Sequence, residues 1–182
     1  LYYDGEGRIP VLSSVRKAEA RRAQNTEPRS YQPIEGAANY RQAVQELVFG
    51  AGHEAVLGKR IATIQTIGGS GALKVGGDFL KRYFPDSEVF VSDPTWDNHR
   101  SLFQFAGFRI NDYPYYDAAT GGVRFDAMLE ALKAMPAKSI VLLHPCCHNP
   151  TGVDLTREEW AEIIRVVAAR GLIPFMDMAY QG

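Results

Sequence analysis

Polar side chains that could do chemistry follow two apolar runs of this chain. Asn149 follows the run that ends at Leu143, and Asp177 and Tyr180 follow the run 172–176. Both runs are expected to be buried strands, and the carboxyl ends of parallel strands meet at the edge of the sheet where α/β folds build ligand sites. A donor amide, a carboxylate and a phenol are therefore expected close together.

These groups suit a planar, hydrogen-bonding aromatic cofactor such as pyridoxal phosphate. Asp177 follows a strand expected to be buried on both faces, and a buried carboxylate needs a partner. A protonated pyridine nitrogen would be such a partner, and its proton would keep the ring an effective electron sink. Asn149 and Tyr180 can both donate to a phenolate oxygen on the same ring. Taken alone, Asp177 could instead form a salt bridge to an arginine or cap a loop, and Asn149-Pro150 is simply a turn.

A glycine-rich segment, Gly68-Gly69-Ser70-Gly71, is expected to join a strand to a helix. Glycines let the backbone approach a ligand closely, and free N–H groups at a helix start attract anions. The segment is therefore a candidate phosphate cradle, with a tight turn as the alternative. It is not a Walker loop, because no Gly-Lys-Ser/Thr is present. The dinucleotide pattern also fails, because Lys74 stands where its third glycine belongs.

Three ring-bearing side chains are further candidates. Trp96 follows a strand and could stack on a flat cofactor, although by itself it is better explained as a core tryptophan. His99 lies one helical turn further on the same face, where it could touch Asp177 or cap a surface. Tyr31 lies in a polar segment and would reach a site only through a tertiary or subunit contact.

The only two cysteines, Cys146 and Cys147, are adjacent, a spacing that rarely suits a structural disulfide. We therefore expect a reducing, cytoplasmic setting. His144 and His148 flank the pair and invite a zinc interpretation, but the spacing matches no familiar paired-ligand pattern. We expect packing or hydrogen bonding at a strand end instead, and no metal site.

The composition is that of an ordinary globular protein, with 182 residues, 46% hydrophobic and 23% charged, and a net charge of -1. This charge gives no sign of nucleic acid or an anionic membrane as a partner. No apolar run approaches the roughly 18 residues of a membrane span, and no signal peptide is visible. The chain begins without Met and ends just beyond a strand, so we expect a piece of a longer protein.

Strands that alternate with helices predict a mostly parallel, doubly wound α/β sheet flanked by helices. Strands are expected at 60–67, 88–92, 108–113, 139–144 and 172–177. Helices are expected at 10–24, 38–49, 72–84, 96–106, 126–134 and 156–170. The last helix should begin with a capping box, Thr156 with Glu159, and end at Gly171.

Four segments of the chain, in order, resemble the class I aminotransferases, the fold type I pyridoxal-phosphate enzymes of the aspartate and aromatic amino acid group. They are Gly69 to Lys74, Asp93 to His99, His144 to Gly152 and Asp177 to Gly182. Leu1-Tyr2-Tyr3 and the glycine segment look closer to the bacterial aromatic (tyrosine) enzyme than to the aspartate enzyme. The resemblance implies an N-terminal segment and helix at 1–36 and an incomplete cofactor-binding large domain at 37–182.

The resemblance also implies roles on the cofactor. Gly69 and Ser70 would bind its phosphate, and Asp177 would pair with the pyridine nitrogen. His99 would support Asp177. Tyr180 would bind the phenolic oxygen.

The remaining implied roles concern the substrate and a second subunit. Trp96 would stack on the ring and contact the substrate. Asn149 would bind the phenolic oxygen and the carboxylate region of the substrate. Tyr31 would reach the phosphate of the neighbouring subunit, which implies a homodimer with shared active sites.

The catalytic lysine of the family is expected beyond Gly182, because no lysine of this chain stands in the family's Ser-x-Ser-Lys context. The lysines present are Lys17, Lys59, Lys74, Lys81, Lys133 and Lys138. The family's substrate-binding arginines and N-terminal lid are also absent.

We therefore expect a transaminase that moves an amino group from an aromatic or dicarboxylic amino acid to 2-oxoglutarate, with this chain alone inactive. The alternatives are a lyase or decarboxylase on the same fold, a chain that only binds or scaffolds a dimer, and nucleotide binding.

Overall fold

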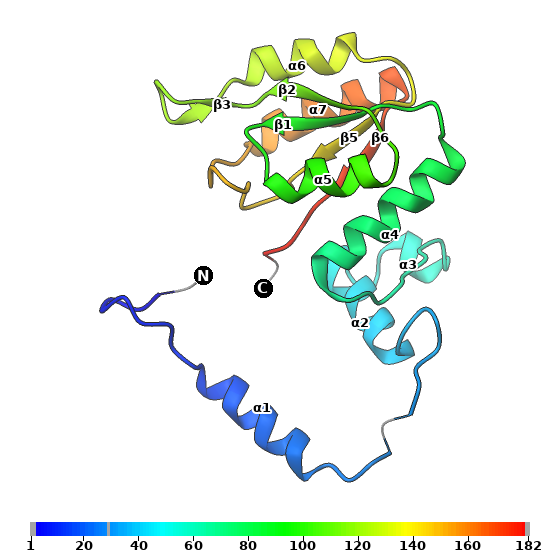
Figure 1. The fold of residues 1–182 in the computed structure, drawn as a ribbon, viewed down its shortest axis with the longest axis vertical. Helices are drawn as coiled ribbons and strands as arrows, with labels where there is room; N and C mark the ends of the chain where they lie inside the picture. The colour runs from blue at the N-terminus through cyan, green and yellow to red at the C-terminus, as the bar shows by residue number, and fades with distance from the viewer. Residues whose placement is uncertain (1–2, 29, 181–182) are drawn as a thin grey trace. The chain divides into compact units, whose positions relative to one another are not determined.

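The computed structural model describes residues 3–28 and 30–180 (Figure 1). The chain forms two compact units, residues 1–64 and 65–182. Leu1 and Tyr2, and Gln181 and Gly182, belong to segments that carry the family resemblance and lie outside the described residues. The domain boundary expected after residue 36 marks where a cofactor-binding domain would begin, and it stays a prediction.

A parallel sheet of four strands forms the centre of the 65–182 unit, which confirms the predicted fold class. The strands are β1 (Val89–Asp93), β2 (Ile110–Pro114), β5 (Ile140–Leu143) and β6 (Ile173–Met176). Their order is β2-β1-β5-β6, and every neighbouring pair is parallel. The chain first adds β2 on one side of β1 and then returns to add β5 on the other side. The order therefore reverses between β1 and β5, where ligands bind in open α/β sheets.

Helices cover both faces of this sheet (Figure 1). They are α4 (Gly68–Tyr83), α5 (Asp97–Phe105), α6 (Phe125–Ala134) and α7 (Arg157–Arg170). Alternate residues of β5 explain the arrangement: Ile140 and Leu142 pack in a core cluster with Phe103 of α5, whereas Val141 packs with Met128 of α6 in a second cluster. A strand buried on both faces needs this continuous apolar run.

The predicted ends of α7 are confirmed. The Thr156 hydroxyl accepts from the backbone N–H of Glu159, and the Glu159 carboxylate accepts from the N–H of Thr156. Gly171 ends the helix in the left-handed conformation, with φ 61°. A residue without Cβ adopts this conformation at little cost, which is why glycine commonly stands there.

The strand predicted at 60–67 is wrong. Residues 60–67 form no strand, and α4 begins at Gly68, four residues before its predicted start. Alternating apolar residues make a strand only where a neighbouring strand supplies hydrogen bonds. Here the Gln45 side chain donates to the Ile61 carbonyl at 3.2 Å and to the Thr63 hydroxyl at 2.8 Å.

The sequence also missed a short hairpin and misjudged β6. The hairpin pairs β3 (Tyr116–Asp117) with β4 (Gly122–Val123) antiparallel. β6 was expected to be buried on both faces, but its residues alternate between half-buried and exposed. It is the last strand in the order, so among the described residues only β5 pairs with it.

The 1–64 unit contains the helices α1 (Ser13–Gln24), α2 (Ala38–Phe49) and α3 (Glu54–Leu57). α2 has the predicted bounds, and α1 begins three residues later than its predicted range, 10–24. None of these helices has a buried residue. Over the described part of the chain, no helix is both long and apolar enough to cross a membrane.

Candidate functional site

A pocket of about 190 Å³ in the 65–182 unit brings together most of the predicted site residues. Those that line it are Gly69, Ser70, Trp96, Asn149, Asp177 and Tyr180. They come from the start of α4 and from the segments that follow β1, β5 and β6. The pocket therefore lies at the carboxyl edge of the sheet, where the strand order reverses.

Four further residues line the pocket, and the sequence did not predict them as site residues: Leu73, His144, Cys146 and Ala179. Their neighbours gave the only signal, since each lies within five residues of a predicted one. A larger hollow of about 430 Å³ lies at the other edge of the sheet, around residues 83–88 and 136–139. It contains none of the predicted site residues.

The first turn of α4 presents backbone donors to the pocket. The N–H groups of Gly69 and Ser70 have no acceptor within the helix, because the first turn of any helix lacks them. The helix has no side-chain cap and no acidic residue in its first turn. A Cβ added at Gly69 would meet no atom within 4 Å, so the backbone there is open to approach. This end of α4 therefore offers positive potential and free donors to an anion.

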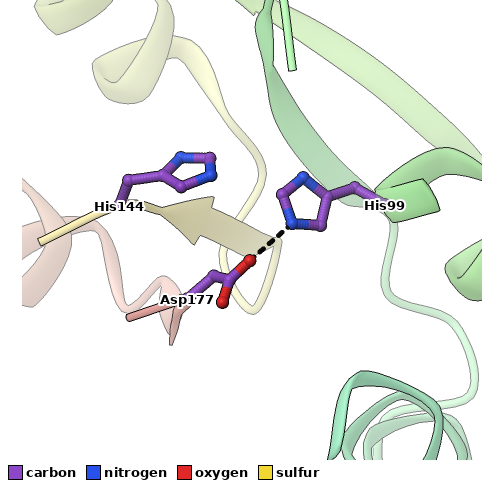
Figure 2. A group of neighbouring side chains, drawn as sticks. All are labelled: His99, His144 and Asp177. Atoms are coloured by element: carbon purple, nitrogen blue, oxygen red, sulfur yellow. Dashed lines mark hydrogen bonds and ion pairs between the residues drawn. The ribbon is translucent and has the colours of Figure 1, made fainter. Parts of the chain in front are cut away.

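The Asp177 carboxylate is held by a buried histidine (Figure 2). His99 is fully buried, and its Nε2 lies 2.7 Å from Asp177 Oδ2 while its Nδ1 lies 2.8 Å from the Thr95 hydroxyl oxygen. A carboxylate only accepts, so His99 donates from Nε2. This hydrogen bond holds the pKa of Asp177 below its usual value, although burial opposes it. Asp177 is therefore an anion at neutral pH and suits a cationic ring nitrogen.

His99 begins a row of three imidazole rings. The ring centres of His99 and His144 are 5.2 Å apart, and those of His144 and His148 are 4.5 Å apart. Burial lowers the pKa of both His144 and His148 to about 4. Both rings are therefore neutral at neutral pH, and neither adds a positive charge that would compete for Asp177.

Donor atoms of His99, His144 and Asp177 all lie within 4.8 Å of one another, close enough to be considered as a metal site. Both ring nitrogens of His99 are already hydrogen-bonded, so a metal ion would have to displace Asp177 or Thr95. The zinc set considered from the sequence is not supported either, because both ring nitrogens of His148 bind hydroxyl groups and Cys147 is exposed. His99 and Asp177 are therefore held by hydrogen bonds, whereas Nδ1 of His144 is buried and has no hydrogen-bond partner among the described residues.

The remaining predicted residues occupy different settings. Trp96 caps α5, is half-buried, and meets the His99 ring edge-on with 5.4 Å between ring centres. Tyr180 lines the pocket and is 55% exposed. Tyr31 belongs to the 1–64 unit and is fully exposed, so its expected contact with a second subunit stays a prediction.

The donor set of the pocket fits pyridoxal phosphate. Free backbone N–H groups and the Ser70 hydroxyl suit its phosphate, and the Asp177 carboxylate suits a protonated pyridine nitrogen. Asn149 and Tyr180 supply donors for the phenolic oxygen, and Trp96 supplies an aromatic surface. The phosphate, the ring nitrogen, the phenolic oxygen and the ring face of the cofactor thus each have a complementary group around one pocket.

The sequence profile of the family described as aminotransferase class I and II matches residues 2–182. The chain is 58% identical to a tyrosine aminotransferase of Klebsiella pneumoniae and 59% identical to an aromatic-amino-acid aminotransferase of Escherichia coli. It is 54% identical to an aspartate aminotransferase of Pseudomonas aeruginosa. Each alignment covers 100% of this chain and 46% of the relative.

Solved structures give the same result. The fold matches an aromatic amino acid aminotransferase from Burkholderia cenocepacia with a TM-score of 0.96 at 63% identity, over 100% of this chain and 46% of that one. An aromatic-amino-acid aminotransferase from Burkholderia pseudomallei, covalently bound to pyridoxal phosphate, matches with a TM-score of 0.96 at 50% identity, over 100% and 45%. The resemblance seen in the sequence is thereby confirmed, and the chain spans about half the length of the relatives it matches.

Proposed function

Because the chain belongs to the class I and II aminotransferases, we propose that it forms the cofactor-binding part of a transaminase. The whole protein would move an amino group from an aromatic or dicarboxylic amino acid to 2-oxoglutarate. The observation that carries this proposal is one pocket lined by all the residues predicted to bind pyridoxal phosphate except Tyr31. The aromatic and dicarboxylic substrates rest on the relatives, which are tyrosine, aromatic-amino-acid and aspartate aminotransferases.

Two parts of the pocket hold the ends of the cofactor. Pyridoxal phosphate, when bound, supplies an electron-poor ring that stabilises negative charge on the substrate carbon. Gly69 and Ser70 hold its phosphate through the first turn of α4. Asp177 keeps a proton on the pyridine nitrogen, because its lowered pKa makes it an anion at neutral pH. His99 orients Asp177 through the 2.7 Å hydrogen bond.

Three side chains act on the face and edge of the ring. Asn149 and Tyr180 donate to the phenolic oxygen and so hold negative charge there. Asn149 also meets the carboxylate region of the substrate. Trp96 covers one face of the ring, which excludes water and presents the indole to the substrate.

We propose that the residue that binds the cofactor covalently is none of the six lysines of this chain. No lysine is among the residues that line the pocket. Lys74, the lysine closest in sequence to the phosphate cradle, is half-buried and ion-paired with Asp78 on α4. We therefore propose that residues 1–182 alone do not catalyse transamination. We also propose a cytoplasmic homodimer in which Tyr31 completes the site of the partner subunit.

The test uses the protein expressed from the complete gene. The protein is reduced with borohydride in the presence of pyridoxal phosphate, and the modified peptide is mapped by mass spectrometry. We expect a pyridoxyl group on a lysine that follows residue 182 in the complete protein. Modification of one of the six lysines present here would contradict the proposed place of the lysine. No modified lysine, with the cofactor in excess, would contradict the aminotransferase function.

A second measurement separates transamination from the lyase and decarboxylase alternatives. The same protein is incubated with a panel of aromatic and dicarboxylic amino acids and 2-oxoglutarate. We expect glutamate to appear in equal amount to the 2-oxo acid product. Carbon dioxide or ammonia without glutamate would favour the alternatives. Residues 1–182 alone, assayed beside free pyridoxal phosphate, should give no rate above the free cofactor.

A further inference from the structure

Asn149 stands on a turn whose neighbouring residue, His148, is buried and has no role in the proposed chemistry. His148 is 2% exposed. Its backbone N–H donates to Asp154 Oδ1 at 2.8 Å, and its carbonyl accepts from the N–H of Gly152 at 2.6 Å. These two hydrogen bonds join the residue before Asn149 to residues after it, and so they close the turn that presents Asn149 to the pocket.

The imidazole of His148 extends this anchorage into the sheet. Nε2 lies 2.9 Å from the hydroxyl oxygen of Ser92 in β1, and Nδ1 lies 2.8 Å from the hydroxyl oxygen of Thr151. The ring stacks on Tyr115, with 3.9 Å between ring centres and 15° between ring planes. The phenol of Tyr115 in turn donates to the carbonyl of Val153 at 2.6 Å. The His148 ring is thus bound to β1 through Ser92. Both the ring and the segment after the turn contact Tyr115, which directly follows β2.

Each nitrogen of the His148 ring has a hydroxyl partner, Ser92 at Nε2 and Thr151 at Nδ1. A hydroxyl can donate or accept, so a neutral ring can donate to one of these hydroxyls and accept from the other.

The surroundings of Thr151 indicate which nitrogen of His148 carries the proton. The Thr151 oxygen accepts from the N–H of Val153 at 3.2 Å, which leaves the Thr151 proton free to donate to Nδ1 of His148. Nδ1 is then an acceptor, and the ring is neutral. Burial, which lowers the pKa of His148 to about 4, acts in the same sense. A chain of hydrogen bonds thus runs from Thr151 in the turn through His148 to Ser92 in β1.

We propose that His148 is the positioning residue for Asn149, and that its neutral ring, protonated on Nε2, clamps the turn of Asn149 to the centre of the sheet. The proposal deepens the proposed function, on which its effect on cofactor binding rests. His148 touches neither substrate nor cofactor and acts through Asn149. Substitution of His148 should therefore affect cofactor binding only through the Asn149 side chain. It should have little effect once that side chain has been removed.

The first arm of the test needs no cofactor. In the full-length protein with ¹⁵N-labelled histidine and asparagine, NMR at neutral pH should show His148 as the Nε2–H tautomer. The side-chain amide signals of Asn149 should shift in His148→Phe, which keeps a stackable ring and removes both nitrogens. They should return toward wild type in His148→Gln, which keeps one donor and one acceptor. A Nδ1–H tautomer, or Asn149 signals unchanged in His148→Phe, would overturn the proposal.

The second arm measures coupling through a double-mutant cycle. His148→Phe should weaken the affinity for pyridoxal phosphate about tenfold, as expected when buried hydroxyls lose their partner. In an Asn149→Ala background the same substitution should change the affinity less than about twofold. By itself, His148→Phe should also shift the pH at which the bound cofactor changes its visible absorbance, and Asn149→Ala should shift this pH in the same direction. Equal effects with and without the Asn149 side chain would show a general structural role and overturn the proposal.

Controls keep the outcomes distinct. His53→Phe, at an exposed histidine of the 1–64 unit, should leave the affinity within about twofold. If His148→Phe does not fold, Ser92→Ala removes the acceptor of Nε2–H and should give the same cycle with Asn149→Ala. Wild-type protein that takes up no pyridoxal phosphate would contradict the proposed function, and the tautomer and Asn149 signals would then decide the clamp by themselves.

Discussion

In residues 65–182 the apolar side chains of β1, β5 and α6 are buried, whereas in residues 1–64 those of α1 and α2 are exposed. Among the described residues, every buried hydrophobic side chain lies between Leu73 and Leu172. In the 1–64 unit, Leu47 is 66% exposed and Val15 45% exposed. Both units contain helices of 12 residues or more, so helix length does not explain the difference.

The sheet explains the difference. A helix buries its apolar stripe only against another apolar surface, and the 65–182 unit supplies one on each face of β5. The described residues of the 1–64 unit contain no strand. The pocket lies in the unit with the core, because groups that must hold a cofactor in a fixed geometry need rigid elements behind them. Substitutions whose effects should differ between the two units therefore test this explanation.

The largest expected effect falls on the pocket. Asp177→Asn in the full-length protein should lower kcat/KM for transamination roughly 10²–10³-fold, because a neutral amide cannot hold the proton on the pyridine nitrogen. Steady-state kinetics with an aromatic amino acid and 2-oxoglutarate measure it. Asp86→Asn, at an exposed carboxylate, is the matched control and should stay near wild type. Equal rates for the two variants would remove Asp177 from the proposed site.

The next effect concerns the core. Leu142→Ala should destabilise the folded state by about 2–5 kcal/mol, because the fully buried side chain leaves a cavity between β5 and α5. Leu47→Ala removes the same atoms from an exposed position of α2 and should change stability by about 0.5 kcal/mol or less. Urea unfolding of residues 1–182, followed by circular dichroism, compares the two. Comparable losses would show that the apolar face of α2 is covered.

Mild acid should destabilise the 65–182 unit, which contains the buried His144 and His148. The pKa of His144 and of His148 falls from 6.5 to about 4 on burial. Between these values the unfolded chain binds more protons than the folded chain, so stability falls as the pH drops from about 6.5 to about 4. The urea midpoint of the full-length protein at several pH values measures this slope. His148→Phe, which removes one of the two groups, should flatten it, and an unchanged slope would contradict the assignment.

The smallest expected effect concerns a helix cap. Thr156→Ala should destabilise the 65–182 unit by about 1 kcal/mol, because it removes the capping box of α7. The residue at the same position of α1, Leu12, makes no side-chain cap. Leu12→Ala should therefore change the urea midpoint of residues 1–182 very little. A loss at Leu12 equal to that at Thr156 would mean that the end of α1 is held by contacts other than a cap.

The sequence alone determined the elements whose signals are local. The continuous apolar run of β5 and the pairing of Thr156 with Glu159 each depend on residues close together in the chain, and both predictions were confirmed. The predicted bounds of α2 were also confirmed, because its apolar spacing is helical wherever the helix packs. Asn149, Asp177 and Tyr180 were named for similar reasons, since they follow strand ends.

Only the tertiary structure decided matters that depend on distant neighbours. Among the described residues, the segment 60–67 has the alternation of a strand but no strand beside it, and β6, at the end of the strand order, has one exposed side. The chain of hydrogen bonds through Ser92 and His148 joins residues 56 positions apart. No local pattern encodes such a contact, because hydrogen-bond partners and burial are set by the packing of whole elements, and the sequence shows only the order in which they come.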